Sequence, residues 1–224
     1  MTKLTPALKK SITSDWQTLL PQFVSFQPMG LARRIGPLVQ GVCLDRDSSN
    51  AAYLPTLHVH CLCRPFPVVS LNLGQPLLSP RSGTAERIAV QFHEGRDKEA
   101  CTRLVASSLL PVEGDWRLAD VLGAYEKYRQ LERPDARYPV PLMEDAVSIC
   151  AWLGKADEAS ALVSRYLDEA EGWPLNILVR QGGLAGWQQT LNDLARSGEK
   201  LRQVADEQIE ALKLQQIPVS QLLP

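Results

Sequence analysis

Residues 56–63, Thr-Leu-His-Val-His-Cys-Leu-Cys, are the stretch on which the fold prediction depends. Apolar and polar side chains alternate along it, and a period of two is typical of a β-strand. The same stretch holds two of the three histidines and two of the five cysteines of the chain. It is therefore both a clear predicted strand and the densest group of side chains that can bind a metal or act as nucleophiles.

Alternation along this strand separates the two residue types. Successive side chains point to opposite faces of a strand, so Cys61 and Cys63 are expected on one face and His58 and His60 on the other. Reduced cysteines on an apolar face behave as small buried hydrophobic residues. A Cys-x-Cys pair on a flat strand does not wrap around an ion as the turns of zinc sites do. Only the histidine face remains as a candidate site.

A metal site on that face needs a third ligand, and the remaining histidine is His93. If residues 87–92 form a neighbouring strand, His93 lies on its polar face near His58 and His60. These three histidines are then candidate ligands for a divalent metal in a metal-dependent hydrolase. Residues 85–92 are equally compatible with a helix, and a histidine pair on a half-exposed strand needs no metal to explain it.

The segments on either side of this strand have a similar pattern up to residue 92. Prolines and glycines separate short segments rich in β-branched residues, which is typical of strands. An amphipathic helix over residues 6–20 precedes them, with Thr5 as its N-cap and Pro21 ending it. The predicted strands are 22–27, 38–44, 56–63, 67–73 and 87–92. We expect an antiparallel or mixed sheet of roughly four or five strands.

After residue 96 the apolar positions recur at helical spacing. The predicted helices are 97–109, 116–131, 142–153, 157–170 and 187–213, whereas residues 173–186 remain ambiguous. A run of strands followed by a run of helices predicts an α+β fold, here with a C-terminal layer of roughly four to six helices. We expect one domain over residues 1–224. If there are two, the proline-rich loop 133–141 divides residues 1–132 from residues 142–224.

Residues 146–169 are predicted to form a tight helical hairpin, with Gly154 at the position where a helix commonly ends. The hairpin resembles one tetratricopeptide-type unit in its Leu153-Gly154 bend and in the following Ala159. Such repeats need about three stacked copies. The sequence has no second copy at the required period, so a solenoid is not expected.

Composition and charge restrict the class of protein. The chain is 45% hydrophobic and 22% charged, which is ordinary for a globular protein. No apolar run is long enough to cross a membrane, and the first residues lack the apolar core of a signal peptide. Five cysteines, an odd number, indicate reduced thiols rather than a disulfide framework. These features predict a cytoplasmic location.

The net charge is −1, which gives no general attraction to nucleic acid. The charge is unevenly distributed: residues 1–80 carry seven Lys/Arg and three Asp/Glu, and residues 81–224 carry 17 and 22. Arg33 and Arg34 lie in the basic part and are candidate binding residues for RNA or for an acidic partner. No aromatic residue flanks them for base stacking, so a solvated sheet edge is the competing interpretation.

No catalytic motif is present in the sequence. It has no phosphate-binding glycine loop and no nucleophile elbow, and Cys101 and Cys150 are predicted to be packing residues. We therefore expect a non-catalytic protein without a cofactor that binds one protein partner, as a bacterial toxin-neutralising (immunity-type) protein or another adaptor does. The alternatives are the metal-dependent hydrolase built on His58, His60 and His93, and an RNA-binding accessory protein that uses the Arg33 region.

Overall fold

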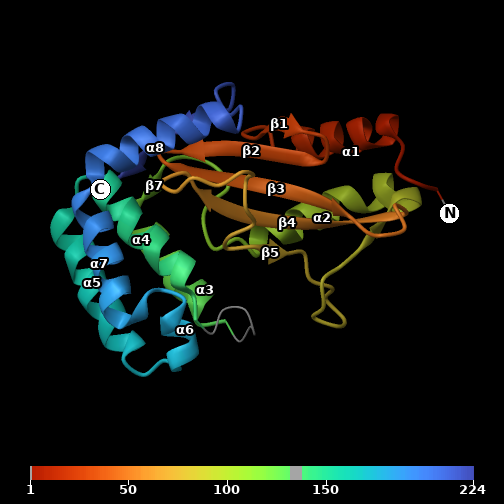
Figure 1. The fold of residues 1–224 in the computed structure, drawn as a ribbon. Coiled ribbons are helices and arrows are strands. Elements are labelled where there is room, and N and C mark those ends of the chain that lie inside the picture. Colours follow the sequence, from red (N-terminus) through yellow and green to blue (C-terminus); the bar gives the residue numbers. More distant parts are fainter. Residues whose placement is uncertain (1, 132–137) are drawn as a thin grey trace. The chain divides into compact units, whose positions relative to one another are not determined.

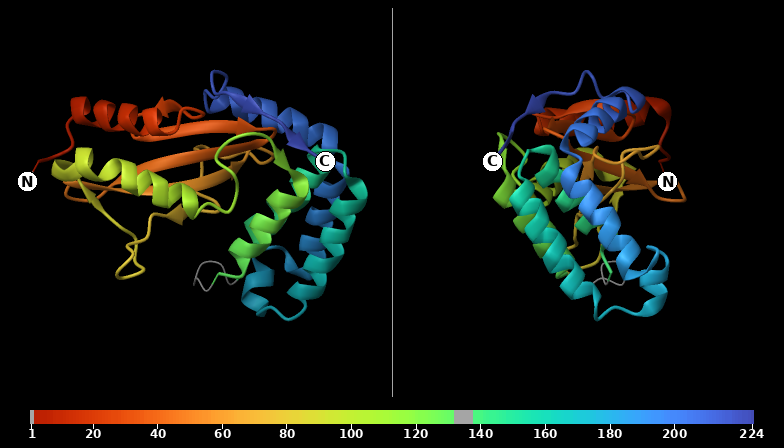
Figure 2. Two further views of the ribbon diagram at one scale, coloured as in Figure 1. Left: turned by 180° about the vertical axis from the view of Figure 1, so that it is seen from behind. Right: turned by 60° about the vertical axis from the view of Figure 1, so that its left-hand side comes forward.

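The computed structural model describes residues 2–131 and 138–224, which form two compact units (Figures 1 and 2). Unit 1 comprises Met1–His60, Val68–Asp115 and Leu212–Gln221, and unit 2 comprises Cys61–Pro67, Trp116–Ala211 and Leu222–Pro224. The element order is an N-terminal helix, a mostly antiparallel sheet and then several helices. This order confirms the predicted α+β class. The single domain stays a prediction.

Unit 1 is built on a sheet in which β1 to β5 are adjacent in sequence order. The bounds are β1 Val24–Gln27, β2 Gly30–Ile35, β3 Leu38–Arg46, β4 Ala52–Cys61, β5 Gln75–Pro76, β6 Ile88–Ala89 and β8 Val219–Ser220. Strand β2 pairs antiparallel with β1 and with β3, and β4 pairs antiparallel with β5 and β6. The short strand β8 pairs parallel with the end of β2.

Two helices cover one face of this sheet: α1 (Pro6–Leu19) and α2 (His93–Ala106), the latter preceded by the 3₁₀ turn η1 (Val90–Phe92). Helix α1 begins as its sequence predicts, because the Thr5 hydroxyl accepts the Leu8 N–H and proline follows at the first helical position. Helix α2 lies behind the strands in Figure 1 and in front of them in the left view of Figure 2. Between helices and sheet lies a core that includes Trp16, Phe23 and Tyr53, all fully buried.

Unit 2 is helical. Its elements are β7 Trp116–Arg117, α3 Leu118–Arg129, α4 Val140–Trp152, α5 Ala156–Ala170, α6 Leu175–Val179, α7 Gly183–Arg196, α8 Gly198–Ala211 and β9 Leu222–Leu223. Helix α4 is buried along most of its length and packs against α5, α7 and α8. The predicted hairpin of α4 and α5 is confirmed, and Gly154 ends α4 in the left-handed conformation (φ +77°) that glycine adopts without strain.

Several sequence predictions need correction. Residues 67–73 are not a strand, and residues 87–92 form only the short strand β6 followed by η1. Strand β2 was not predicted. The helix predicted over 187–213 is divided into α7 and α8 at Ser197. The loop suggested as a domain boundary lies largely outside the described residues, and the chain passes between the two units at other positions.

No helix among the described residues is both long enough and apolar enough to cross a membrane.

Candidate functional site

The two histidines of β4 are buried, not half-exposed. His58 and His60 are each 2% exposed. Residues 69–71, which follow β4 and are called the covering segment, lie against them. The His60 Nδ1 atom lies 2.8 Å from the Ser70 hydroxyl and accepts the Ser70 backbone N–H at 3.2 Å. Burial, followed by repulsion from His60, lowers the pKa of His58 to about 4. His58 is therefore neutral at neutral pH.

His58 packs directly against the backbone of the neighbouring strand. A Cβ atom placed on Gly41 in β3 would lie 2.4 Å from His58 Nε2 and 2.6 Å from Cε1. Only glycine leaves room for the imidazole ring at this position. The ring also lines a cavity of about 240 Å³ whose other walls include Cys43 and Leu71. In this setting His58 fills space between the sheet and the segment that covers it.

The predicted position of His93 is wrong. His93 is the first residue of α2 and does not lie on a strand beside His58 and His60. Strand β6, just before it, pairs with Ala52 and Tyr53 at the start of β4, whereas His58 and His60 lie near its end. Among the described residues, no group of three or more His, Cys, Asp or Glu side chains is placed to hold a metal ion. The three histidines therefore do not form the predicted metal site.

The cysteine pair is buried as the strand alternation suggested. Cys61 and Cys63 are 3% and 4% exposed, and their side chains hydrogen-bond to one another. This hydrogen bond, together with burial, raises the pKa of Cys61 well above that of a free thiol. A thiol with a raised pKa stays protonated, which is the opposite of what a nucleophilic cysteine needs.

Arg33 has a structural role. Its side chain is buried against the sheet, where Nε donates to Gln40 Oε1 at 2.8 Å and the two terminal nitrogens donate to the carbonyls of Gly114 and Pro111 at 3.0 Å each. Burial lowers the pKa of Arg33 to about 10, still well above neutrality. Its buried guanidinium cannot serve as the predicted binding surface. Arg34 is half-buried on the opposite face of β2.

A chain of hydrogen bonds links α1, β4 and α2 on the face of the sheet opposite to His58 and His60. Trp16 Nε1 donates to the Tyr53 hydroxyl at 3.2 Å, and that hydroxyl lies 2.7 Å from His93 Nδ1. His93 Nε2 lies 3.1 Å from Asp15 Oδ2, and the Ser11 hydroxyl lies 3.4 Å from the same oxygen. Trp16 and Tyr53 are fully buried, whereas the Asp15 side chain is 45% exposed. This series of hydrogen bonds therefore runs from the core to the surface.

The groups at the two ends of this hydrogen-bond chain have fixed roles. The Trp16 indole can only donate, so the Tyr53 oxygen accepts and its own hydrogen is free to point at His93 Nδ1. The Asp15 carboxylate accepts, so His93 Nε2 carries the proton. This arrangement engages both ring nitrogens of His93. Burial also raises the pKa of Tyr53 far above its usual value, so its hydroxyl stays protonated.

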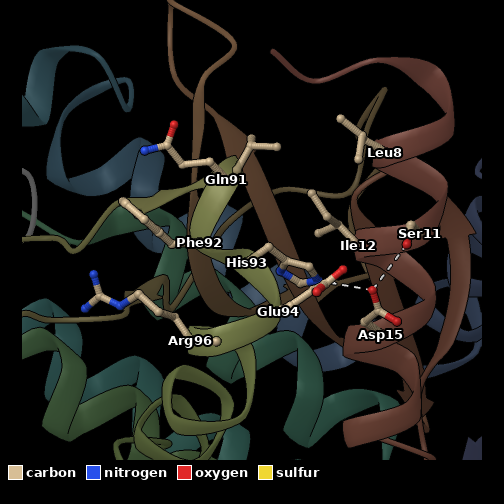
Figure 3. A pocket seen from close by; sticks show the side chains of 11 residues that line it. Leu8, Ser11, Ile12, Asp15, Gln91, Phe92, His93, Glu94 and Arg96 are labelled. Atoms are coloured by element: carbon tan, nitrogen blue, oxygen red, sulfur yellow. Dashed lines mark hydrogen bonds and ion pairs between the residues drawn. The ribbon is translucent and has the colours of Figure 1, made fainter. Parts of the chain in front are cut away.

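The exposed end of this chain lies in a cavity of about 520 Å³ between α1 and the start of α2, which we call the α1–α2 cavity (Figure 3). Figure 3 shows Ser11, Asp15, His93 and Glu94 gathered on one side, with Phe92 and Arg96 on the other. The complete lining is Leu8, Ser11, Ile12, Asp15 and Val90–Arg96. Another cavity of about 510 Å³ lies beside α1 around Lys10 and Phe26, but it contains none of the hydrogen-bond chain.

The α1–α2 cavity combines charged, polar and apolar groups. His93 has both ring nitrogens engaged and is 6% exposed, so it is not positioned as a base for a bound molecule. The groups that a ligand can reach are the Asp15 and Glu94 carboxylates, the Ser11 hydroxyl, the polar ends of Gln91 and Arg96, and apolar surface. The amino-acid sequence does not reveal this site, because its residues come from three elements that only the tertiary fold brings together. The one available signal was an isolated histidine next to an exposed aromatic residue, Phe92.

Comparisons of the chain with protein-family models, with curated proteins and with solved structures found no match.

Proposed function

We propose that this protein is a non-catalytic protein-binding protein of the toxin-neutralising or adaptor kind, and that the α1–α2 cavity is where its partner docks. The observation that carries the proposal is Phe92, which is 56% exposed at the edge of the cavity. A large aromatic side chain exposed beside a concave, partly apolar site is typical of the anchor residues of protein interfaces.

The interior of the cavity supports binding rather than turnover. Its floor includes Ile12, which is buried, and Leu8, which is half-buried. Its buried polar atoms are tied into the chain from Trp16 to Asp15, so the floor is held in one conformation. A pre-formed site loses little conformational entropy when a partner binds, and this favours tight association.

A photo-crosslinking amino acid, p-benzoylphenylalanine, placed at position 92 tests the proposal in cells that naturally produce the protein. The matched control carries it at Leu78, which is 51% exposed and does not line the cavity. We expect one protein to be crosslinked from position 92 and not from position 78. Absence of an adduct at position 92, or the same set of adducts from both positions, would refute the proposed docking site.

The toxin-neutralising form of the proposal has its own test. The protein crosslinked at position 92 is expressed alone and together with this chain. An immunity-type function predicts that the partner arrests growth by itself and that co-expression restores growth. A Phe92→Ala variant should restore growth less well, because it removes the exposed anchor. A partner that is harmless by itself would exclude the immunity-type function and leave the adaptor function.

A further inference from the structure

The Asp15 carboxylate is held in a fixed orientation at the α1–α2 cavity. The hydrogen bonds from His93 and Ser11 both end on Oδ2. His93 is itself fixed by the Tyr53 hydroxyl, and that hydroxyl is fixed by the indole of Trp16. The carboxylate is 45% exposed and lines the cavity, so a ligand can reach it. Such an oriented acceptor needs little rearrangement before it binds a donor.

The charged groups that line the cavity leave it net negative. Glu94, an exposed residue in the first turn of α2, lies beside Asp15 and His93 in Figure 3. Among the described residues of the lining, the one cation is Arg96, and its guanidinium is engaged by the Glu86 carboxylate at 2.7 Å. Glu86 is 9% exposed and also pairs with Arg103 at 2.9 Å. Arg96, whose side chain is 47% exposed, is therefore paired with a carboxylate from outside the lining.

Apolar surface completes the site. Leu8 and Ile12 from α1 and Phe92 from η1 line the same cavity as the two carboxylates. An amphipathic cation matches this combination, because its methylene groups can contact the apolar walls while its charged end reaches a carboxylate. Lysine and arginine side chains have this composition. An aromatic residue such as Phe92 also attracts a cation that passes over its ring.

We infer that the α1–α2 cavity receives a lysine or arginine side chain of the protein partner, whose charged end pairs with Asp15 and Glu94. This inference rests on the proposed function and adds the chemistry of the partner. An apolar residue next to the basic one in the partner would contact Phe92. The occupant is thus a basic segment with an apolar neighbour, presented on a protein surface.

Two synthetic probes test the inference on the full chain. They are the acetylated and amidated dipeptides leucyl-arginine and leucyl-citrulline, which differ in charge and have nearly the same shape. Binding is followed by amide chemical shifts in ¹⁵N-labelled protein. We expect the arginine probe to shift the amides of Ser11, Phe92 and Glu94 and to bind about fivefold more tightly than the citrulline probe. Added salt should reduce that difference.

Variants of the chain separate a charge effect from a folding effect. Glu94→Gln removes an exposed carboxylate of the cavity, and Asp15→Asn removes the oriented one; each should weaken the arginine probe several-fold. The matched control is Glu99→Gln, which removes a 70% exposed carboxylate of α2 outside the cavity and should change nothing. Asp15→Asn also removes a hydrogen-bond partner of His93 and can therefore disturb folding. If the Asp15→Asn protein folds poorly, the result with the exposed Glu94→Gln variant decides the test.

Each outcome supports or overturns the inference. Equal affinity for the two probes, shifts that map elsewhere, or no binding of the arginine probe would overturn it. A partner crosslinked at position 92 through a segment without a basic side chain would also overturn it, while the proposed function would stand. Conversely, selective binding of the arginine probe without any crosslinked partner would count against the proposed function and leave the cation site in place.

Discussion

Replacement of Gly41 by alanine should destabilise the protein through one neighbour, the ring of His58. The new Cβ would lie 2.4 Å from Nε2 and 2.6 Å from Cε1, whereas atoms in contact prefer about 3.5–4.0 Å. The overlap therefore exceeds about 1 Å. His58 is 2% exposed and cannot swing into solvent without opening the covering segment. Overpacking of this kind costs about 1–3 kcal/mol.

A double-mutant cycle shows whether the ring is the cause. In a His58→Ala background the clash is absent, and the closest remaining contact of the new Cβ is the Leu31 carbonyl oxygen at 3.2 Å. We expect Gly41→Ala to cost less than about 1 kcal/mol there, which gives a coupling energy of about 1–2 kcal/mol. The free energies are measured by urea unfolding followed by circular dichroism.

The control for this cycle is Gly123→Ala in α3, where an added Cβ meets no atom within 4 Å. That change should stabilise the helix by up to about 1 kcal/mol, because alanine is a better helix former than glycine. The reasoning would be refuted if Gly41→Ala had the same cost with and without the His58 ring.

Three further predictions concern other buried groups. Burial lowers the pKa of His58 from 6.5 to about 4, so only the unfolded chain takes up this proton as the pH falls from about 6.5 to 4. The free energy of unfolding should therefore drop by up to about 3 kcal/mol over this range. A pH series with the His58→Gln variant should lack this drop. Tyr53→Phe leaves a buried indole and imidazole without their shared hydroxyl and should cost about 1–3 kcal/mol in urea unfolding. By contrast, Tyr125→Phe should cost little, because the buried Tyr125 hydroxyl has no hydrogen-bond partner among the described residues. Similar costs for Tyr53→Phe and Tyr125→Phe would show that the hydrogen bonds of Tyr53 do not stabilise the fold. Arg33→Lys cannot make the three hydrogen bonds of the guanidinium and should lower the midpoint of thermal unfolding by several degrees, whereas an unchanged midpoint would show that these bonds contribute little.

The sequence predicted the elements whose apolar periodicity is strong. Helix α1, strands β3 and β4 and helices α3 to α5 were all anticipated within a few residues. Strand β2 was missed because Arg33 and Arg34 looked like a solvated pair. The burial of Arg33 depends on carbonyl acceptors some 80 residues away in the chain, so no local pattern indicates it.

The candidate site was less accessible to prediction than the fold. The importance of His93 depends on Tyr53 and Asp15, which lie 40 and 78 residues from it in the chain. The sequence drew attention to histidines that were close together on one strand, and these turned out to be buried packing groups. Proximity in the chain drew attention to that pair, whereas the proposed site is assembled by the packing of α1 and α2 on the sheet.

The parallel pairing of β8 with β2 determines which experiments can test the proposed partner-binding surface. Strand β1 pairs with the first half of β2, and β8 pairs with Arg34 and Ile35 in its second half. A fragment that stops before residue 212 would leave that second half as an open edge, and open edges promote aggregation. Because both units are built from interleaved segments, no single cut releases either one intact. The proposed binding surface must therefore be mapped with point substitutions in the undivided chain, since a truncated protein that fails to bind would report only a damaged sheet.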